Sequence, residues 1–269
     1  MNACVWAVKA WGLDLTRNST AVLRNVGLTA RLGVIHAIVG PNGSGKTTLL
    51  RLLAGLLRPS AGTVEILGRP LAASSHRQRA RTMAYLPQNL PGPLPLTVRE
   101  LVLLGRTAHQ GLLGLETRAD QEAVERSLNL ARVAHLAEAR LEHLSGGELQ
   151  RAFIAKALCQ EPAILLLDEP TASLDPAHGL QVMELLAGLR SAQAVCTVMA
   201  SHDLNLAARY ADEATLLQGG RVVCQGNPAM VFAPERLEPV YGCGFERCPS
   251  SAGPGVLLPF PSGAKRQQG

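Results

Sequence analysis

The chain has 269 residues, of which 47% are hydrophobic and 17% are charged, a length that suits one large or two modest domains. It contains no apolar run long enough to cross a membrane and begins without a secretory signal, so we expect a cytosolic protein. The net charge is +5, but aromatic residues make up only 3% of the chain and no run of lysines and arginines occurs, so no nucleic acid partner is expected.

The first predicted strands come before residue 34. Short apolar segments at 5–10, 13–16 and 22–30 are separated by a glycine and by a polar turn. Their lengths and spacing indicate antiparallel β structure, and a further segment at 63–67 follows another turn-forming sequence. We therefore expect an N-terminal antiparallel β layer.

A glycine-rich loop follows an apolar strand and precedes a run of helix formers. Its sequence matches G-x-x-x-x-G-K-[ST], the pattern of loops that bind nucleotide phosphates. Glycines let backbone N–H groups curl around an anion, and the N-terminus of the following helix adds its positive dipole end. Lys46 would contact the β- and γ-phosphates, and the Thr47 hydroxyl would bind Mg²⁺. The predicted nucleotide-binding residues of this loop are Gly40, Pro41, Asn42, Gly43, Ser44, Gly45, Lys46, Thr47 and Thr48.

The chain after the next strand is mostly helical. Residues 82–88 are predicted to form a strand that ends at a proline, with Gln88 directly after it. A helix is predicted at 98–104, and a second at about 118–132 has apolar residues spaced i, i+4 and i+7. Residues 89–160 therefore form a helical insertion between strands of the main sheet.

The insertion closes with the sequence LSGGELQR at 144–151. Ser145 and Glu148 have the spacing of a capping box, so one interpretation is simply a well-capped helix start. Gly146 and Gly147 argue for more than a cap, because each glycine within a helix costs about 1 kcal/mol relative to alanine. They are useful if another group must approach the backbone donors closely, and an anion is the natural ligand of a helix N-terminus.

Two acidic residues follow the next strand. The continuous apolar run at 163–167 has the pattern of a strand that is buried on both faces of a parallel sheet. It ends in Asp168 and Glu169. Beside a phosphate-binding loop, Asp168 can hold Mg²⁺, and Glu169 can activate the attacking water.

Two later residues are further candidates. Asp175 precedes Pro176, and the simple interpretation is an ordinary N-cap with proline at the first helical position. His202 follows a buried strand at 195–200. It therefore lies at the carboxyl end of that strand, the edge where ligands bind in open α/β sheets.

The C-terminal part of the chain contains one more predicted supersecondary element. Residues 214–218 and 221–225 are predicted to form a hairpin around two glycines. The sequence from Ser250 is rich in Gly, Pro and Ser. We therefore expect a single domain over 1–249 and a weakly ordered tail over 250–269.

Taken in order, the motifs GPNGSGKT, LSGGE, ILLLDEP and SLD resemble those of ABC-type ATPases, over roughly residues 5–245. This resemblance implies an α/β fold: a RecA-like P-loop core with a mostly parallel sheet, an N-terminal antiparallel β layer and a helical subdomain at about 89–160. It also implies that ATP is hydrolysed with Mg²⁺, in a head-to-tail homodimer that encloses two ATP molecules.

The same resemblance implies roles for individual residues. Gln88 would sense the metal and the water, His202 would contact the γ-phosphate, and Asp175 would cross the dimer interface. Residues 145–148 of one subunit would meet the γ-phosphate that is bound by the other. The implied metal ligands are Thr47, Gln88 and Asp168.

One position departs from the family pattern. The family usually places an aromatic residue on the loop before the core, where it stacks on adenine. Alignment of residues 22–26 with that pattern puts Arg17 at this position, and arginine can stack through its guanidinium plane.

A narrower resemblance concerns the transported substrate. Residues 101–109, 202–211, 231–241 and 256–259 are similar to ATPase subunits of bacterial importers for iron siderophores, haem and cobalamin. This resemblance implies a polytopic membrane permease, an extracytoplasmic substrate-binding protein and a peripheral location at the cytoplasmic face of the bacterial inner membrane. The alternatives are an ABC-type ATPase that acts on nucleic acid or the ribosome, and a nucleotide-dependent scaffold that does not hydrolyse ATP.

Overall fold

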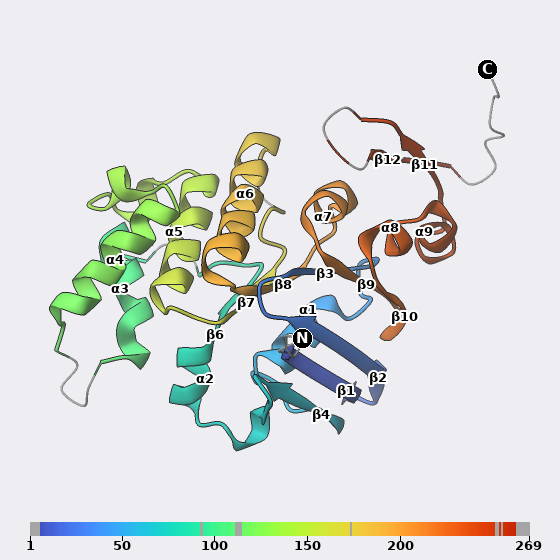
Figure 1. Ribbon diagram of the computed structural model, residues 1–269, viewed down its shortest axis with the longest axis horizontal. Coiled ribbons are helices and arrows are strands. Elements are labelled where there is room, and N and C mark those ends of the chain that lie inside the picture. The colour runs from blue at the N-terminus through green and yellow to red at the C-terminus, as the bar shows by residue number, and fades with distance from the viewer. Residues whose placement is uncertain are drawn as a thin grey trace, which may run out of the picture.

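The computed structural model describes residues 6–91, 94–110, 115–172, 174–250, 253 and 255–261. A central, mostly parallel sheet runs through the molecule, with an antiparallel sheet of N-terminal strands on one side and most of the helices on the other (Figure 1). Two hydrophobic clusters fill the two faces of the central sheet.

The N-terminal strands form an antiparallel sheet with the order β2-β1-β4-β5, which confirms the expected β layer. The segments expected at 5–10 and 13–16 are one continuous strand, whose register against its neighbour shifts at several points instead of breaking. A tight turn at Asn18 and Ser19, both with positive φ, reverses the chain. The strands are β1 (Trp6–Arg17), β2 (Thr20–Arg31), β4 (Ala61–Ile66) and β5 (Arg69–Pro70).

The central sheet has the order β10-β9-β3-β8-β7-β6. All neighbouring pairs in it are parallel except β9 and β10, which form the predicted hairpin. β3, β7 and β8 are buried along their whole lengths, as the continuous apolar runs predict. The strands are β3 (Ile35–Val39), β6 (Met83–Leu86), β7 (Ile164–Asp168), β8 (Cys196–Ala200), β9 (Glu213–Gln218) and β10 (Arg221–Gly226).

Helices cover both faces of the central sheet. Helix α1 (Lys46–Leu53) packs its leucines between the central and the antiparallel sheets. On the other face, the helices of the insertion and of the C-terminal half share one hydrophobic core. They are α3 (Val98–Leu103), α4 (Arg118–Leu130), α5 (Gly146–Cys159), α6 (Pro176–Gln193), α7 (Leu204–Tyr210), α8 (Pro228–Val231) and α9 (Pro234–Tyr241).

Shorter helical elements complete the chain. Helix α2 (His76–Thr82) buries none of its residues. The 3₁₀ helices are Leu71–Ala73, Leu104–Ala108, Ala134–Leu136 and Leu141–His143.

A buried ion pair connects three segments of the helical insertion. Arg106 Nε donates to Asp120 Oδ1 at 2.8 Å, and both side chains are more than nine-tenths buried. Arg106 Nη1 also donates to Glu161 Oε2 and to the Cys159 carbonyl, at 2.8 and 2.9 Å. Asp120 completes the capping box of α4 with Thr117. Arg106 thereby ties the turn after α3 to the start of α4 and the end of α5.

Part of the expected C-terminal tail is a strand. β12 (Val256–Phe260) pairs with β11 (Gly244–Cys248), so the expectation of weak order from Ser250 onward is wrong for this segment. The physical reason is twofold. Leu257 is buried in the same core as β7, and the Asn205 side chain on α7 accepts from its N–H at 2.8 Å and donates to its carbonyl at 3.3 Å. The rest of the expected tail falls largely outside the described residues.

None of the helices within the described ranges combines the length and the apolar character that crossing a lipid bilayer requires.

Replacing Arg106 by leucine should leave the Asp120 carboxylate buried without its partner, and breaking such a pair lowers the free energy of unfolding by about 3–5 kcal/mol. Urea unfolding followed by circular dichroism measures this loss. Arg118→Leu is the matched control, because the Arg118–Glu122 pair on α4 is exposed, and exposed pairs contribute little. Equal unfolding midpoints for the two variants would contradict the role of Arg106.

Candidate functional site

A cleft of about 710 Å³ lies where the strands of the central sheet end at their carboxyl edge. It gathers the loop after β3, the segment after β6 and the residues that follow β7 and β8. Most of the sequence-predicted site residues line it. The lining residues are Val22, Asn42, Gly43, Ser44, Gly45, Lys46, Thr47, Thr48, Gln88, Glu169, Ala172 and His202.

The phosphate loop is fixed against β9 and the turn after it. Gly40 has φ 152°, and a Cβ at this position would collide with the Leu217 carbonyl, so only glycine fits. The Gly220 N–H donates to the Ser44 carbonyl at 3.0 Å. The shape of the loop is therefore set by backbone contacts with the β9–β10 hairpin.

Lys46 is the first residue of α1, and its ammonium turns back over the loop. Nζ donates to the Gly40 carbonyl at 2.9 Å and to the Pro41 carbonyl at 3.2 Å. Burial lowers the pKa of Lys46, whereas the neighbouring carboxylates of Glu169 and Asp168 raise it. A phosphate bound in the cleft would offset the effect of burial on the pKa of Lys46, because an opposite charge favours the charged form of the lysine.

Asp168 ends β7 and is hydrogen-bonded from two sides. Thr47 Oγ1 donates to its Oδ1 at 2.9 Å, and the Tyr85 hydroxyl donates to its Oδ2 at 3.3 Å. Burial raises the pKa of Asp168, although the bonds from Thr47 and Tyr85 act in the opposite direction. A cation at this point would favour the ionised carboxylate. The hydroxyl and carboxylate oxygens are the hard ligands that Mg²⁺ prefers, so these residues fit a magnesium ion.

Two predicted residues converge on Glu169. Gln88 Nε2 donates to Glu169 Oε2 at 2.7 Å, and His202 Nδ1 lies 3.3 Å from the same oxygen. The Glu169 side chain is 12% exposed, whereas that of His202 is 50% exposed. The carboxylate is thus held between an amide and an imidazole at the wall of the cleft. Because Gln88 uses its amide nitrogen here, its amide oxygen is the end that could bind a metal.

The backbone of Glu169 is unusual for a residue with a side chain. Its φ is 53°, in the left-handed region, which costs a non-glycine residue about 1–2 kcal/mol. Its N–H donates to the Ala200 carbonyl at 3.0 Å, so the pairing of the strand ends of β7 and β8 maintains this conformation. Backbone strain of this kind concentrates at functional sites.

Some residues of the site differ from the expected set. Arg17 is exposed at the end of β1 and is not among the described residues that line the cleft. Val22 and Ala172 do line it, and Tyr85 contacts Asp168, although the sequence assigned them no role. For Val22 a signal existed, since it belongs to the same aligned segment that pointed to Arg17. The sequence gives no such indication for Tyr85, beyond its place on the strand before Gln88.

Residues 145–148, which we call the Ser145 loop, and Asp175 are not among the described residues that line the cleft. Ser145 and Glu148 form the capping box that their spacing predicts: the Ser145 N–H donates to Glu148 Oε2 at 2.8 Å, and Ser145 Oγ accepts from the Glu148 N–H at 3.4 Å. Ser75, Thr97 and Thr117 cap α2, α3 and α4 with the same reciprocal bonds, and none of these is followed by two glycines. The cap alone therefore does not explain the glycines of α5.

The two glycines have different surroundings. A Cβ on Gly146 would meet nothing within 4 Å, whereas a Cβ on Gly147 would lie 3.0 Å from the ring of His178. Gly146 is exposed and Gly147 is buried. Packing within the chain accounts for Gly147 but not for Gly146.

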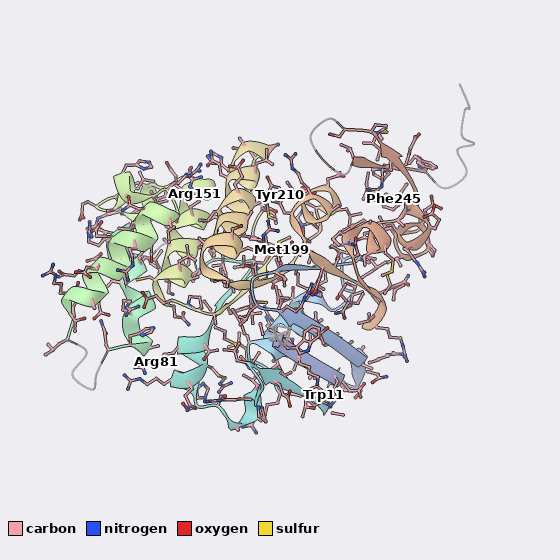
Figure 2. The ribbon with its side chains drawn as sticks, viewed as in Figure 1. Trp11, Arg81, Arg151, Met199, Tyr210 and Phe245 are labelled. Atoms are coloured by element: carbon pink, nitrogen blue, oxygen red, sulfur yellow. The ribbon has the colours of Figure 1, made fainter. Side chains whose placement is uncertain are left out.

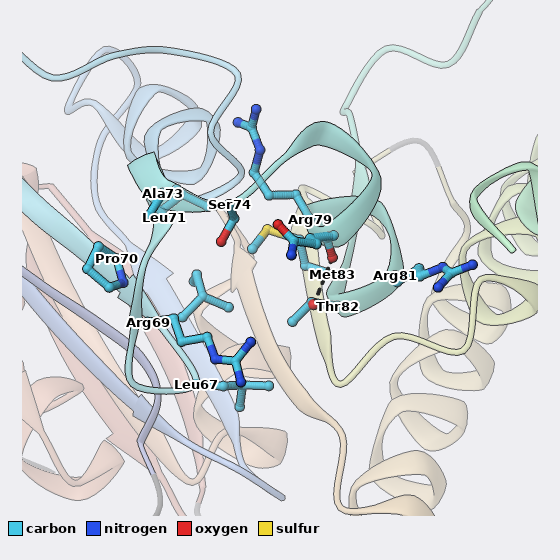
Figure 3. A pocket seen from close by; sticks show the side chains of 12 residues that line it. Leu67, Arg69, Pro70, Leu71, Ala73, Ser74, Arg79, Arg81, Thr82 and Met83 are labelled. Carbon is cyan, nitrogen blue, oxygen red and sulfur yellow. Dashed lines mark hydrogen bonds between the residues drawn. The ribbon is translucent and has the colours of Figure 1, made fainter.

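A second hollow, of about 420 Å³, lies beside α2. Pro70 and Leu71 lie across it from Arg79 and Met83, and Arg81 points away (Figure 3). The Thr82 hydroxyl donates to the Gln78 carbonyl at 2.9 Å. None of the predicted nucleotide-binding residues lines this hollow, so it is separate from the phosphate cleft.

The chain is similar in sequence to known transport ATPases. Residues 23–172 match the family model described as ABC transporter. A hemin import ATP-binding protein of Gloeobacter violaceus is 42% identical over 243 residues, which cover 87% of each chain. A ferric enterobactin transport ATP-binding protein of Escherichia coli K12 is 38% identical, over 90% of this chain and 89% of the relative.

Solved structures agree with these sequence matches. A chain of an inward-facing ABC transporter assigned to the metal-chelate type has a TM-score of 0.84 at 26% identity, covering 96% of this chain and 98% of its own. A dimeric bacterial ABC transporter cassette has a TM-score of 0.74 at 28% identity, covering 82% of this chain and 98% of its own. The chain therefore belongs to the ABC transporter family, as an ATP-binding subunit with ATPase activity.

Proposed function

We propose that this chain powers the import of an iron chelate, haem or cobalamin by hydrolysing ATP beside a separate membrane permease. Gln88 and His202 converge on Glu169 in the cleft that Lys46 also lines, and this convergence carries the hydrolytic part of the proposal. The substrate class is supported by the relatives, which are named for hemin import, ferric enterobactin transport and cobalamin import.

The geometry suggests how each group acts. The backbone donors of the loop and the Lys46 ammonium bind the β- and γ-phosphates, with charge-assisted bonds that strengthen as charge builds on the transferred group. Glu169 accepts a proton from the attacking water, and Gln88 and His202 hold its carboxylate in place. Mg²⁺, held by Thr47, Gln88 and Asp168, would neutralise charge on the phosphate oxygens.

The remaining predicted residues act from a second copy of the chain in this proposal. Ser145, Gly146, Gly147 and Glu148 would meet the γ-phosphate that the partner holds, and Asp175 would cross the interface. The open space around Gly146 supports this arrangement, as does the similarity to a dimeric cassette. The homodimer therefore completes each ATP site with groups from both subunits.

The adenine contact is proposed to involve Arg17 and Val22. Val22 already lines the cleft, and Arg17 ends the adjacent strand, where its guanidinium can stack on a base. An apolar contact from Val22 and a stacked guanidinium from Arg17 would together replace the aromatic residue that the family usually has.

The proposal also names partners and a location. The ATPase dimer would bind a polytopic permease at the cytoplasmic face of the bacterial inner membrane and drive its transport cycle. An extracytoplasmic binding protein would deliver the substrate to this permease. No nucleic acid partner is proposed. A ribosome- or nucleic-acid-directed ATPase is the competing function, but the relatives reported above are named for import or transport.

Lys46→Ala should lower ATP turnover at least about 100-fold, because it removes a positive charge from the β- and γ-phosphates, where such clamps contribute several kcal/mol. Phosphate release by the purified dimer measures the effect. Lys9→Ala, on the exposed face of β1, is the matched control and should keep normal turnover. Wild-type turnover in Lys46→Ala would remove this lysine from the site.

Glu169→Gln should retain ATP binding but lose hydrolysis by a factor of about 10²–10⁴, the usual effect of removing a general base. Loss of the charge should also favour the ATP-bound dimer, which size-exclusion chromatography with ATP would show. Glu184→Gln, exposed on α6, is the control. A Glu169→Gln variant that stays monomeric and hydrolyses normally would exclude Glu169 as the base.

Co-expression with the proposed polytopic permease should give a membrane complex whose ATPase activity rises when the loaded binding protein is added. The complex in proteoliposomes would be supplied with ferric siderophore, haem or cobalamin, and uptake of each would be measured. The Glu169→Gln complex is the control for ATP-driven uptake. Recovery of the chain only with ribosomes or nucleic acid would instead favour the competing function.

A further inference from the structure

One residue outside the predicted set, His178, contacts both Asp175 and the N-terminus of α5, the two elements that are proposed to face the partner. It lies in the first turn of α6, three residues after Asp175. Asp175 Oδ1 accepts from the His178 backbone N–H at 2.9 Å, and Asp175 Oδ2 lies 2.7 Å from His178 Nδ1. Both oxygens of the carboxylate are therefore engaged by the same residue, which fixes its orientation.

The bond to a carboxylate also defines the state of the imidazole. An ionised Asp175 can only accept, so Nδ1 must carry the hydrogen. The bonds from the backbone and the ring of His178 lower the pKa of Asp175, which keeps the carboxylate charged. The side chain of Asp175 is nevertheless 58% exposed, so a partner can still reach it.

The ring of His178 also packs against the N-terminus of α5. A Cβ on Gly147 would lie 3.0 Å from the ring Cγ and 3.3 Å from Cδ2, closer than side-chain packing normally allows. A larger residue at 147 would therefore need the imidazole of the same chain to shift by a few tenths of an ångström. This contact joins the N-terminus of α5, and the Ser145 loop that precedes it, to the N-terminus of α6.

A second bridge lies one turn further along both helices. Arg151 Nη1 donates to Gln181 Oε1 at 3.3 Å, and Arg151 lies on the side of α5 that faces α6 (Figure 2). Arg151 is buried. The Gln181 bridge holds the two helices together without touching Asp175, which makes it the natural comparison for His178.

We propose that His178 is a positioning residue that locks Asp175 to the Ser145 loop, so that one chain presents both groups to its partner's ATP as a single rigid element. The inference rests on the proposed shared site of the homodimer. It predicts that substitution of His178 lowers ATP binding at the phosphate loop of the opposite subunit, while the phosphate loop of its own chain still binds ATP.

Cross-linked mixed dimers of the full chain test this prediction, with ATP trapped per dimer as the measurement. In every dimer one subunit carries Lys46→Ala, so only the other subunit's phosphate loop can hold nucleotide. With His178→Ala on the Lys46→Ala subunit, the intact loop faces the altered His178. With His178→Ala on the subunit that has the intact phosphate loop, this loop faces an unaltered His178 on the Lys46→Ala subunit.

We expect about tenfold less trapping in the first arrangement than in the second, a size typical of coupling between sites. The second arrangement should match a dimer that carries Lys46→Ala alone. Equal trapping in the two arrangements, whether high or low, would overturn the proposal, because His178 would then have no specific effect on the opposite subunit's site. Less trapping in the second arrangement would also overturn it, because it would assign His178 a structural role in its own chain. His178→Asn serves as a second variant if His178→Ala folds poorly. Its amide can keep the bond to Asp175 but not the ring contact with Gly147, so it should show the same asymmetry.

Two comparisons separate the inference from the function on which it rests. Ser145→Arg in the same two arrangements should show a larger difference than His178→Ala. If Ser145→Arg shows none, the shared site itself is wrong and the inference falls with it; if only His178→Ala shows none, the inference alone is wrong. Gln181→Ala should leave trapping unchanged in both arrangements. An asymmetry with Gln181→Ala equal to that with His178→Ala would assign the effect to general helix docking and overturn the specific role of His178.

Discussion

The parallel pairing of β3, β8 and β7 is the constraint on which the site depends. It aligns Asp168 with Ala200 and brings the loops that follow these strands to one edge of the sheet. The same pairing holds the backbone of Glu169 in the left-handed region through its bond to the Ala200 carbonyl. A carboxylate at a strand end would otherwise follow the strand direction. The left-handed backbone of Glu169 instead directs its carboxylate toward Gln88 and His202, which both contact Oε2.

Much of this arrangement could be predicted from the sequence, for a physical reason. Apolar runs with abrupt polar ends show where buried parallel strands stop, and residues such as Asp168 and His202 stand at those ends. Contacts between side chains on different elements leave no such pattern. The bond from Tyr85 to Asp168 and the packing of His178 on Gly147 both depend on how distant segments meet in space.

The C-terminal segment also shows that tertiary contacts limit what can be predicted from the sequence. Its composition suggested weak order, because glycine, proline and serine dominate it. Pairing with β11, one buried leucine and the side-chain amide of Asn205 on α7 nevertheless hold Val256–Phe260 as a strand. Local composition therefore failed where tertiary contacts decided the outcome.

The hold of Asn205 on β12 also bears on aggregation. An outer strand with unpaired backbone groups is a template on which other chains can add, and Val256 and Leu258 are exposed on this one. Asn205 occupies both the N–H and the carbonyl of Leu257. Pro259, two residues further and facing the same way along the strand, has no N–H to offer. On the side of β12 that does not pair with β11, Leu257 and Pro259 thus leave no free N–H for an added strand, which disfavours the joining of neighbouring copies there when the protein is crowded.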